Sequence, residues 1–192
     1  MSFNYTTPAD LWPLVNLMRN FLSNISLATY ISLEKFLSLV IAPQLRVALL
    51  RLLGANIGRG VRLHEIRLFN LQHGFRHLTI EDNVHIGPGT RIDLYRSVTI
   101  KRNTVISPEC LLLTHTDMGE FHSSPLSRIY PSIAFDLIIG ESCYIGSRAV
   151  VLAGSNLGNC TLVAAGSIVC SQFRGNVMIA GTPAKEIKQL DI

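Results

Sequence analysis

The feature that most constrains this chain is an apolar repeat with a period of six residues. From Ile139 onward an aliphatic side chain recurs at every sixth position: Ile139, Ile145, Val151, Leu157 and Val163. Four residues after each of them stands a small side chain: Cys143, Ala149, Ser155, Thr161 and Ser167. A period of six fits neither an α-helix nor the simple alternation of a strand, so it indicates a repeat architecture.

An earlier block carries the same step. Its aliphatic positions are Ile80, Ile86, Ile92, Ile100, Ile106 and Leu112. Its small or β-branched positions are Val84, Thr90, Thr104, Cys110 and Thr116, and only Arg96 departs from the pattern. The eight-residue step from Ile92 to Ile100 predicts a two-residue insertion at a corner. Ile57-Gly58 with Val61 is a weaker first instance of the repeat.

The physical solution to a period of six is a coil of three short strands joined by three corners. The aliphatic side chain points into a triangular prism, and the small one lets the chain bend at the corner. Glycine after the aliphatic residue tolerates backbone angles that other residues resist. Successive coils stack at about 4.8 Å, which buries ladders of aliphatic side chains. Antiparallel strands of a sandwich are the alternative, but five hexads stay in phase without hairpin turns.

Two stretches carry a resemblance to a known family. They are Leu111-Leu112-Leu113-Thr114-His115 and the run from Ile139-Gly140 to Gly181-Thr182-Pro183-Ala184-Lys185. With the hexads, they resemble the hexapeptide-repeat acyltransferases, in particular the galactoside and maltose O-acetyltransferases and the colanic-acid-type polysaccharide acetyltransferases. The resemblance implies a mainly β fold, a left-handed parallel β-helix of about five coils over residues 54–190, and it is most specific in the C-terminal half.

Two segments lie outside the repeat. Residues 1–53 have apolar side chains at helical spacing, interrupted at Pro43 and stopped at Gly54, which predicts two or three short helices packed on the prism. Residues 117–136 form one long inserted loop with several aromatic side chains, so we expect it to pack against the substrate or a neighbouring subunit. Residues 174–192 form a C-terminal tail.

Composition narrows the function classes. Hydrophobic residues make up 48% and charged residues 16%, which favours a folded protein. The N-terminal apolar stretches are too short or too interrupted for a spanning helix, so we expect a soluble cytoplasmic protein, with peripheral membrane association left open. The 17 Lys and Arg are scattered, which argues against nucleic-acid binding despite a net charge of +4. The four cysteines lack the spacing of a zinc site or a disulfide scaffold.

His115 is the first candidate for chemistry. It stands where the hexad ladder gives way to the long loop, and a histidine there could merely cap a strand end. The resemblance instead implies that His115 is the general base that takes the proton of an acceptor hydroxyl. Asp93 follows Ile92 about one coil earlier, where it could orient the imidazole, bind the acceptor or sit at a solvated corner. Asp117 is a further candidate for orienting His115.

The cofactor residues come from the resemblance alone. It implies that acetyl-CoA is the acyl donor and that no metal takes part. The matching positions are Tyr144 beside the active site, Ser147 and Ala165 along the cofactor, and Lys185 and Lys188 near its nucleotide end. Each of these could equally be structural. Cys170-Ser171 and Phe173-Arg174 replace a Thr-Lys and a proline pair that the family often carries; Arg174 could supply the charge of the missing lysine.

The sequence therefore predicts an O-acetyltransferase that moves an acetyl group directly from acetyl-CoA to a hydroxyl of a sugar or polysaccharide precursor. A homotrimer with active sites between subunits is expected, because one prism alone leaves its cofactor groove half built. Two alternatives stay open. One is a zinc-dependent carbonic anhydrase of the prism type, using pairs such as His73 and His77 or His115 and His122. The other is a β-helix scaffold without catalysis.

Overall fold

The computed structural model describes residues 12–119 and 125–192, and it shows three parallel sheets wrapped around one prism. The first sheet contains β1 (Asn56–Ile57), β4 (Leu78–Ile80), β7 (Val98–Ile100), β12 (Leu137–Ile139) and β15 (Asn156–Leu157). The second contains β2 (Arg62–Leu63), β5 (His85–Ile86), β8 (Val105–Ile106), β13 (Tyr144–Ile145), β16 (Leu162–Val163) and β18 (Val177–Gly181). The third contains β3 (Arg67–Phe69), β6 (Arg91–Asp93), β9 (Leu111–Leu112), β14 (Val150–Val151) and β17 (Ile168–Val169).

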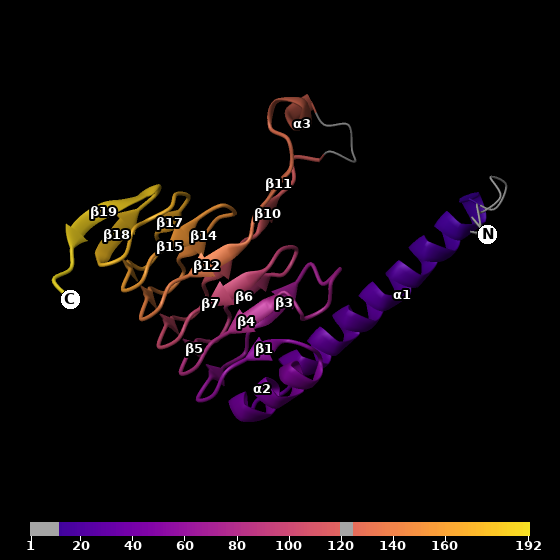
Figure 1. The fold of residues 1–192 in the computed structure, drawn as a ribbon, viewed down its shortest axis with the longest axis horizontal. Helices are drawn as coiled ribbons and strands as arrows, with labels where there is room; N and C mark the ends of the chain where they lie inside the picture. Colours follow the sequence, from indigo (N-terminus) through magenta and orange to yellow (C-terminus); the bar gives the residue numbers. More distant parts are fainter. Residues whose placement is uncertain (1–11, 120–124) are drawn as a thin grey trace, which may run out of the picture.

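The predicted fold class is confirmed: the chain is mainly β, a left-handed parallel β-helix with N-terminal helices and one long loop. Five full coils are present, as expected. A sixth, partial turn follows, because Phe173 bridges Leu157 of the first sheet and β18 extends the second sheet. In Figure 1 the coils stack side by side from β1 near the N-terminal helices to β18 near the C-terminus.

The aliphatic hexad positions form the core. In the first sheet Ile57 pairs with Ile80, Ile80 with Ile100, and Ile100 with Ile139 in successive coils. The matching positions of the other two sheets are buried in the same way, and so are the small positions that the repeat predicts, with one exception. Thr116 is only half-buried, because the chain leaves the prism there to enter the long loop. These ladders account for the low charge content of the chain, since the interior of the prism is filled almost entirely by apolar side chains.

The glycines after the aliphatic positions have a different role from the one expected. Gly140 and Gly146 do not have a positive φ; a Cβ on either would lie 2.5 Å from the backbone of the next coil. The positive φ angles fall two residues later, at Ser142 (56°) and Arg148 (61°). Glycine is therefore required here by the close stacking of coils, and the tight bend is made at the following corner residue.

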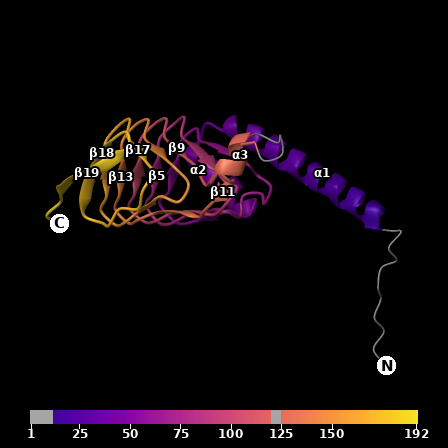
Figure 2. The ribbon, with the colours of Figure 1, turned by 90° about the horizontal axis from the view of Figure 1, so that it is seen from above.

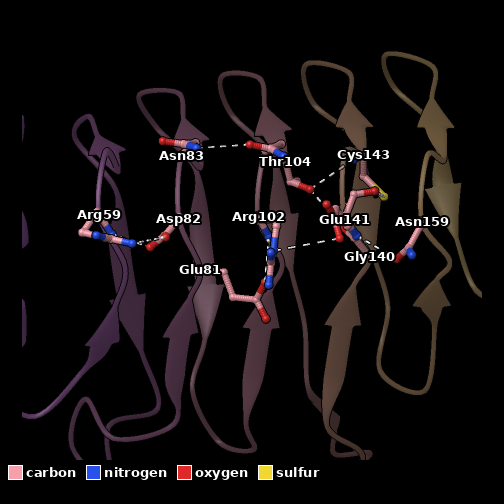
Figure 3. Close-up of polar contacts among 11 residues, drawn as sticks. Arg59, Glu81, Asp82, Asn83, Arg102, Thr104, Gly140, Glu141, Cys143 and Asn159 are labelled. Carbon is pink, nitrogen blue, oxygen red and sulfur yellow. Dashed lines mark hydrogen bonds and ion pairs between the residues drawn. The ribbon is translucent and has the colours of Figure 1, made fainter.

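Small polar side chains satisfy the backbone at the corner between the first and second sheets (Figure 3). Thr104 Oγ1 donates to the carbonyl of Gly140 (2.8 Å) and accepts from the amide of Cys143 (3.1 Å). On the surface of the same corner Arg102 pairs with Glu81 (3.5 Å) of the preceding coil and Glu141 (4.0 Å) of the following one. The buried bonds fix the stacking of neighbouring coils, whereas the exposed pairs add little.

The N-terminal segment consists of α1 (Trp12–Ser38) and α2 (Pro43–Leu52). The prediction of two or three short helices was wrong in length: α1 has 27 residues, since no glycine or proline interrupts the chain between Pro13 and Pro43. Its C-terminal half contacts the prism through Leu27, Tyr30, Leu33 and Leu37. The other half projects beyond the prism (Figure 2). In the described part of the chain no helix is long and apolar enough to cross a bilayer.

The C-terminal residues also differ from the expected tail. β18 runs parallel to β16, and β19 (Ala184–Gln189) returns antiparallel along β18. The end of the chain thus forms a hairpin on the second sheet, next to the last coil (Figure 1).

Arg46 joins the helices to the first coil. This side chain of α2 is 1% exposed and donates only to backbone carbonyls. Its Nε lies 3.3 Å from the oxygen of Leu37, one terminal nitrogen lies 2.9 Å from that of Leu63, and further bonds reach Val40 and His64. Arg46 therefore satisfies the C-terminal carbonyls of α1 and the end of β2 at once.

We expect Arg46→Ala to lower the free energy of unfolding by about 3 kcal/mol or more, because it leaves several buried carbonyls without donors. For a chain of this size that is a drop in melting temperature of roughly 6–12 °C. Arg51→Ala is the matched control on the same helix: Arg51 also donates to carbonyls, of Ile57 and Gly58, but is exposed, so water replaces it. Thermal unfolding that shows equal losses for both variants would contradict this role of Arg46.

Candidate active site

The candidate site lies at the corner where the chain passes from the third sheet to the first. We call this the site corner; it contains residues 70–77, 94–97 and 113–136 in three successive coils. Turn lengths at the other two corners barely vary along the prism. The predicted insertion between Ile92 and Ile100 falls here, and so does the long loop. All major departures from the six-residue period therefore stack on one edge of the molecule.

The long loop leaves the prism as an arm. β10 (His115–Thr116) pairs antiparallel with β11 (Ile133–Ala134), and α3 (Pro125–Ile129) lies at the outer end (Figure 1). His115 faces Ala134 in this two-stranded ladder. The arm thus fixes the backbone of His115 at the base of the projection. His122 lies outside the described residues.

His115 and Asp93 form the closest polar pair of the site. The Nδ1 atom of His115 lies 2.6 Å from Oδ2 of Asp93, the last residue of β6. The Asp93 side chain is fully buried, whereas 26% of the His115 side chain is exposed. The structure therefore brings together the two residues predicted to be catalytic, and it places the carboxylate behind the imidazole.

Four donors surround the carboxylate of Asp93. Its Oδ2 also accepts from the amide of Thr114 (3.0 Å), and its Oδ1 accepts from the amide of Tyr95 (3.0 Å) and from Nδ2 of Asn70 (2.9 Å). Burial raises the pKa of Asp93, but the hydrogen bonds from His115, Asn70, Tyr95 and Thr114 outweigh it and hold the pKa below its usual value. Asp93 is therefore ionised and can only accept, so Nδ1 of His115 is the donor, and in the neutral imidazole the lone pair is on Nε2.

A cavity of about 350 Å³ adjoins His115. Its lining residues are Gln72, Tyr95, His115, Thr116, Asp117, Ser132, Ile133 and Ala134. The ring of Tyr95 stacks on the imidazole, with ring centroids 4.6 Å apart and planes inclined by 22°. Asp117 also lines the cavity; its Oδ1 accepts from the amide of Gly119 (2.8 Å) and from the hydroxyl of Ser132 (3.0 Å). Asp93 is thus the residue that orients His115, and Asp117 orders the arm.

The residues assigned to the cofactor lie elsewhere on the prism. A groove of about 540 Å³ runs over the corner between the second and third sheets, lined in part by Ser147, Ala165 and Gly166. Tyr144 is exposed on β13 of the second sheet, where its hydroxyl accepts from Ser107 (3.1 Å). Lys185 and Lys188 are exposed on β19 of the same sheet. One chain therefore does not bring these five residues to the site corner.

Metal ligands do not gather among the residues that the structure describes: no three His, Cys, Asp or Glu side chains form a group there. His73 and His77 are close, with ring centroids 4.6 Å apart, but Nδ1 of His77 lies 3.1 Å from the carbonyl oxygen of Leu94. This pair lies in the 70–77 segment of the site corner and is not part of a group of three metal-ligating side chains in the described residues.

Asn70, Gln72 and Tyr95 are site residues that the sequence analysis missed. They lie in segments where the hexad pattern fails, so nothing marked them one by one. The spacing of the aliphatic residues could have located them as a group. Each break in the six-residue period marks extra chain at the same corner, and the site residues come from those extra segments.

Proteins of similar sequence are known in Escherichia coli. WbbJ of Escherichia coli strain K12, whose name is that of a lipopolysaccharide biosynthesis O-acetyl transferase, is 34% identical over 116 residues, which is 56% of this chain and 58% of WbbJ. WcaF of the same strain, whose name is that of a colanic acid biosynthesis acetyltransferase, is 28% identical over 144 residues, 75% of this chain and 74% of WcaF. No protein-family model matches the chain.

A solved galactoside acetyltransferase in complex with coenzyme A shares the fold, with a TM-score of 0.75, 22% identity, and coverage of 88% of this chain and 82% of that one. The chain is a hexapeptide-repeat β-helix protein. The resemblance that its hexads carry to the hexapeptide-repeat acetyltransferases is thereby confirmed in sequence and in fold.

Because the pKa of Asp93 is lowered in the folded state, the stability of this hexapeptide-repeat protein should depend on pH. A carboxyl whose pKa is depressed in the folded state stabilises it above the unfolded-state value of about 3.9, and the effect is lost as pH falls through the folded-state pKa. We therefore expect Asp93→Asn to lower the melting temperature at pH 7, and the gap to the wild type to narrow as pH falls below about 4.

Asp136→Asn is the control, since Asp136 is an exposed carboxylate at the same corner, paired with Arg96 (3.7 Å). Its melting temperature should stay close to that of the wild type at every pH, because exposed pairs contribute little. A gap between Asp93→Asn and the wild type that stays constant from pH 7 to pH 3 would show that the charge of Asp93 is not what stabilises the fold.

Proposed function

We propose that this protein is an O-acetyltransferase that moves an acetyl group from acetyl-CoA to a hydroxyl group of a sugar or polysaccharide precursor. The observation that carries the proposal is the His115 imidazole, held through Nδ1 by a buried carboxylate and placed at the wall of a cavity. Such an arrangement leaves Nε2 as an oriented base. The names of WbbJ and WcaF, those of a lipopolysaccharide biosynthesis O-acetyl transferase and a colanic acid biosynthesis acetyltransferase, support the same reaction class.

In the proposed reaction Nε2 of His115 takes the proton from the acceptor hydroxyl as its oxygen attacks the thioester carbonyl of acetyl-CoA. The new C–O bond forms, the C–S bond breaks, and the imidazolium returns the proton to the departing sulfur, so ester and free coenzyme A result. Ionised Asp93 stabilises the imidazolium between these steps. The charge that develops on His115 is thus matched by a charge already in place.

A direct transfer is favoured over an acyl-enzyme. The thiols of Cys110 and Cys143 are buried in the prism, and burial raises the pKa of both. Neither therefore readily forms the thiolate that a nucleophilic cysteine needs. The partner of His115 is a carboxylate and not a hydroxyl or thiol. The base therefore acts on the acceptor itself.

A sugar suits the cavity. The face of Tyr95 offers an apolar platform beside the imidazole, and Gln72, Asp117 and Ser132 offer amide, carboxylate and hydroxyl groups around it. Saccharides present several hydroxyl groups on an apolar ring, so they use both kinds of contact. Free cysteines throughout the chain fit a reducing compartment, and we place the reaction in the cytoplasm.

The separation of His115 from the groove at Ser147 and Ala165 favours a homotrimer with shared sites. Three-fold packing would set the site corner of one copy beside the second sheet of the next, where Tyr144, Lys185 and Lys188 are exposed. The arm also exposes Tyr130, Ile133 and Phe135, and α1 exposes further large apolar side chains. A neighbouring copy would cover these surfaces.

His115→Ala should reduce the rate of acetyl transfer by roughly 10²–10⁴, because it removes the general base. Binding of acetyl-CoA, measured as a rise in melting temperature, should persist, since the groove is unaltered. His122→Ala, in the same loop, is the control and should keep the rate. Transfer to a panel of sugars is the assay; an unchanged rate in His115→Ala, or a collapse only in His122→Ala, would show that another group is the base.

Shared sites can be tested by complementation between subunits. His115→Ala and Ala165→Trp, which fills the groove, should each be inactive, but co-expression should restore roughly a quarter of the wild-type rate, since one interface in four pairs two intact surfaces. Light scattering should show trimers throughout. Trimers without restored activity would place the whole site in one copy. Monomers that sediment with lipid vesicles would instead assign the apolar face of α1 to a membrane surface.

A further inference from the structure

Asn70 lies at the start of the site corner, one coil before Asp93. It directly follows β3 and has a positive φ of 58°, a conformation that asparagine tolerates better than most residues. Phe69 pairs with Asp93 across neighbouring coils, so the next residue reaches over the end of β6. The amide Nδ2 of Asn70 donates to Oδ1 of Asp93 at 2.9 Å.

The contacts of Asp93 divide between its two oxygens. Oδ2 accepts from Nδ1 of His115 and from the amide of Thr114, and Oδ1 accepts from the amide of Tyr95 and from Asn70. A carboxylate offers about four acceptor positions, so the set is full. Two of the four donors are backbone amides fixed by the coils. Asn70 is the side chain that holds the oxygen opposite the imidazole.

We infer that Asn70 is a positioning residue, whose amide holds the Asp93 carboxylate ionised and in the orientation that lets Oδ2 accept from His115. The inference rests on the proposed function, because it assigns Asn70 a part in setting the base. Asparagine is fit for this in two ways. It supplies a neutral donor that adds no second charge to a buried site, and it accepts the left-handed backbone that the turn requires.

The consequence concerns the tautomer of His115. If Asp93 took up a proton, Oδ2 could donate to Nδ1, and the hydrogen of the neutral imidazole would move to Nε2. Nε2 would then face the acceptor as a donor and could not take its proton. A donor on Oδ1 opposes this, since it favours the ionised carboxylate. Asn70 thus acts on the reaction through two intervening residues without touching the substrate.

Two substitutions separate donation from packing. Asn70→Asp keeps the size of the side chain and a residue that accepts positive φ, but replaces the donor by a carboxyl next to Asp93. Asn70→Gly keeps the backbone conformation and removes the side chain. We expect both to lower kcat by roughly 10- to 100-fold at pH 8, the range typical of lost supporting contacts, with KM for acetyl-CoA unchanged.

The pH dependence distinguishes them further. Two carboxyl groups at hydrogen-bond distance cannot both ionise readily, so at lower pH they share one proton and the introduced carboxyl can still donate to Asp93. As pH rises that proton is lost and the two charges repel. The rate of Asn70→Asp relative to wild type should therefore fall as pH rises, whereas that of Asn70→Gly should stay level. A ratio of the Asn70→Asp rate to the wild-type rate that stays level as pH rises would show that the group at position 70 does not act through the charge of Asp93.

Asn83→Gly is the matched control. Asn83 has nearly the same backbone conformation (φ 59°) and also donates through its amide, to Asn103, but at an exposed corner between the first and second sheets. Its kcat should equal that of the wild type. If Asn70→Asp or Asn70→Gly keeps the wild-type kcat at every pH while His115→Ala loses activity, the positioning role of Asn70 is overturned and the proposed function is not. An unchanged rate in His115→Ala would overturn the proposed function first.

Discussion

The close stacking of coils is the constraint on which the rest of this structure depends. Each coil lies directly on the backbone of its neighbour, so that even one Cβ at Gly140 or Gly146 would clash with the next coil. Two corners of the prism repeat with hardly any change in length, because buried bonds such as those of Thr104 tie consecutive turns together. Extra chain can therefore be accommodated at the remaining corner, and that is where the site is found.

The sequence predicted the parts of the molecule that repeat. The aliphatic and small positions, the β-helix and the insertion after Ile92 followed from the period of six, because each hexad meets the same environment in the next coil. The placement of His115 beside Asp93 required the coil geometry as well, which brings residues 22 positions apart to 2.6 Å. The resemblance supplied His115, the hexad position of Asp93 suggested its partner, and the structure supplied the contact.

The parts that were not predicted lie in segments that do not follow the six-residue repeat. Asn70 and Tyr95 stand in turns of irregular length, whose conformation depends on contacts with other coils and not on local pattern. The length of α1 was underestimated because its spacing of apolar residues matched short helices, while the absence of glycine and proline before Pro43 decided the outcome. The role of Gly140 was misjudged for a similar reason: its neighbour is in the next coil, far along the chain.

The burial of Asp93 shows how the fold and the proposed chemistry are linked. An ionised carboxylate in the wall of the prism costs free energy unless donors surround it. The backbone amides of Thr114 and Tyr95, both in the site corner, provide half of these donors. The remaining two donors are His115 and Asn70, side chains from the coils on either side. The same contacts that make the buried charge tolerable thus fix the tautomer of the base. Because all four donors lie on the prism or at the point where the arm leaves it, the outer part of the arm, which includes α3, can vary in sequence without removing any of them.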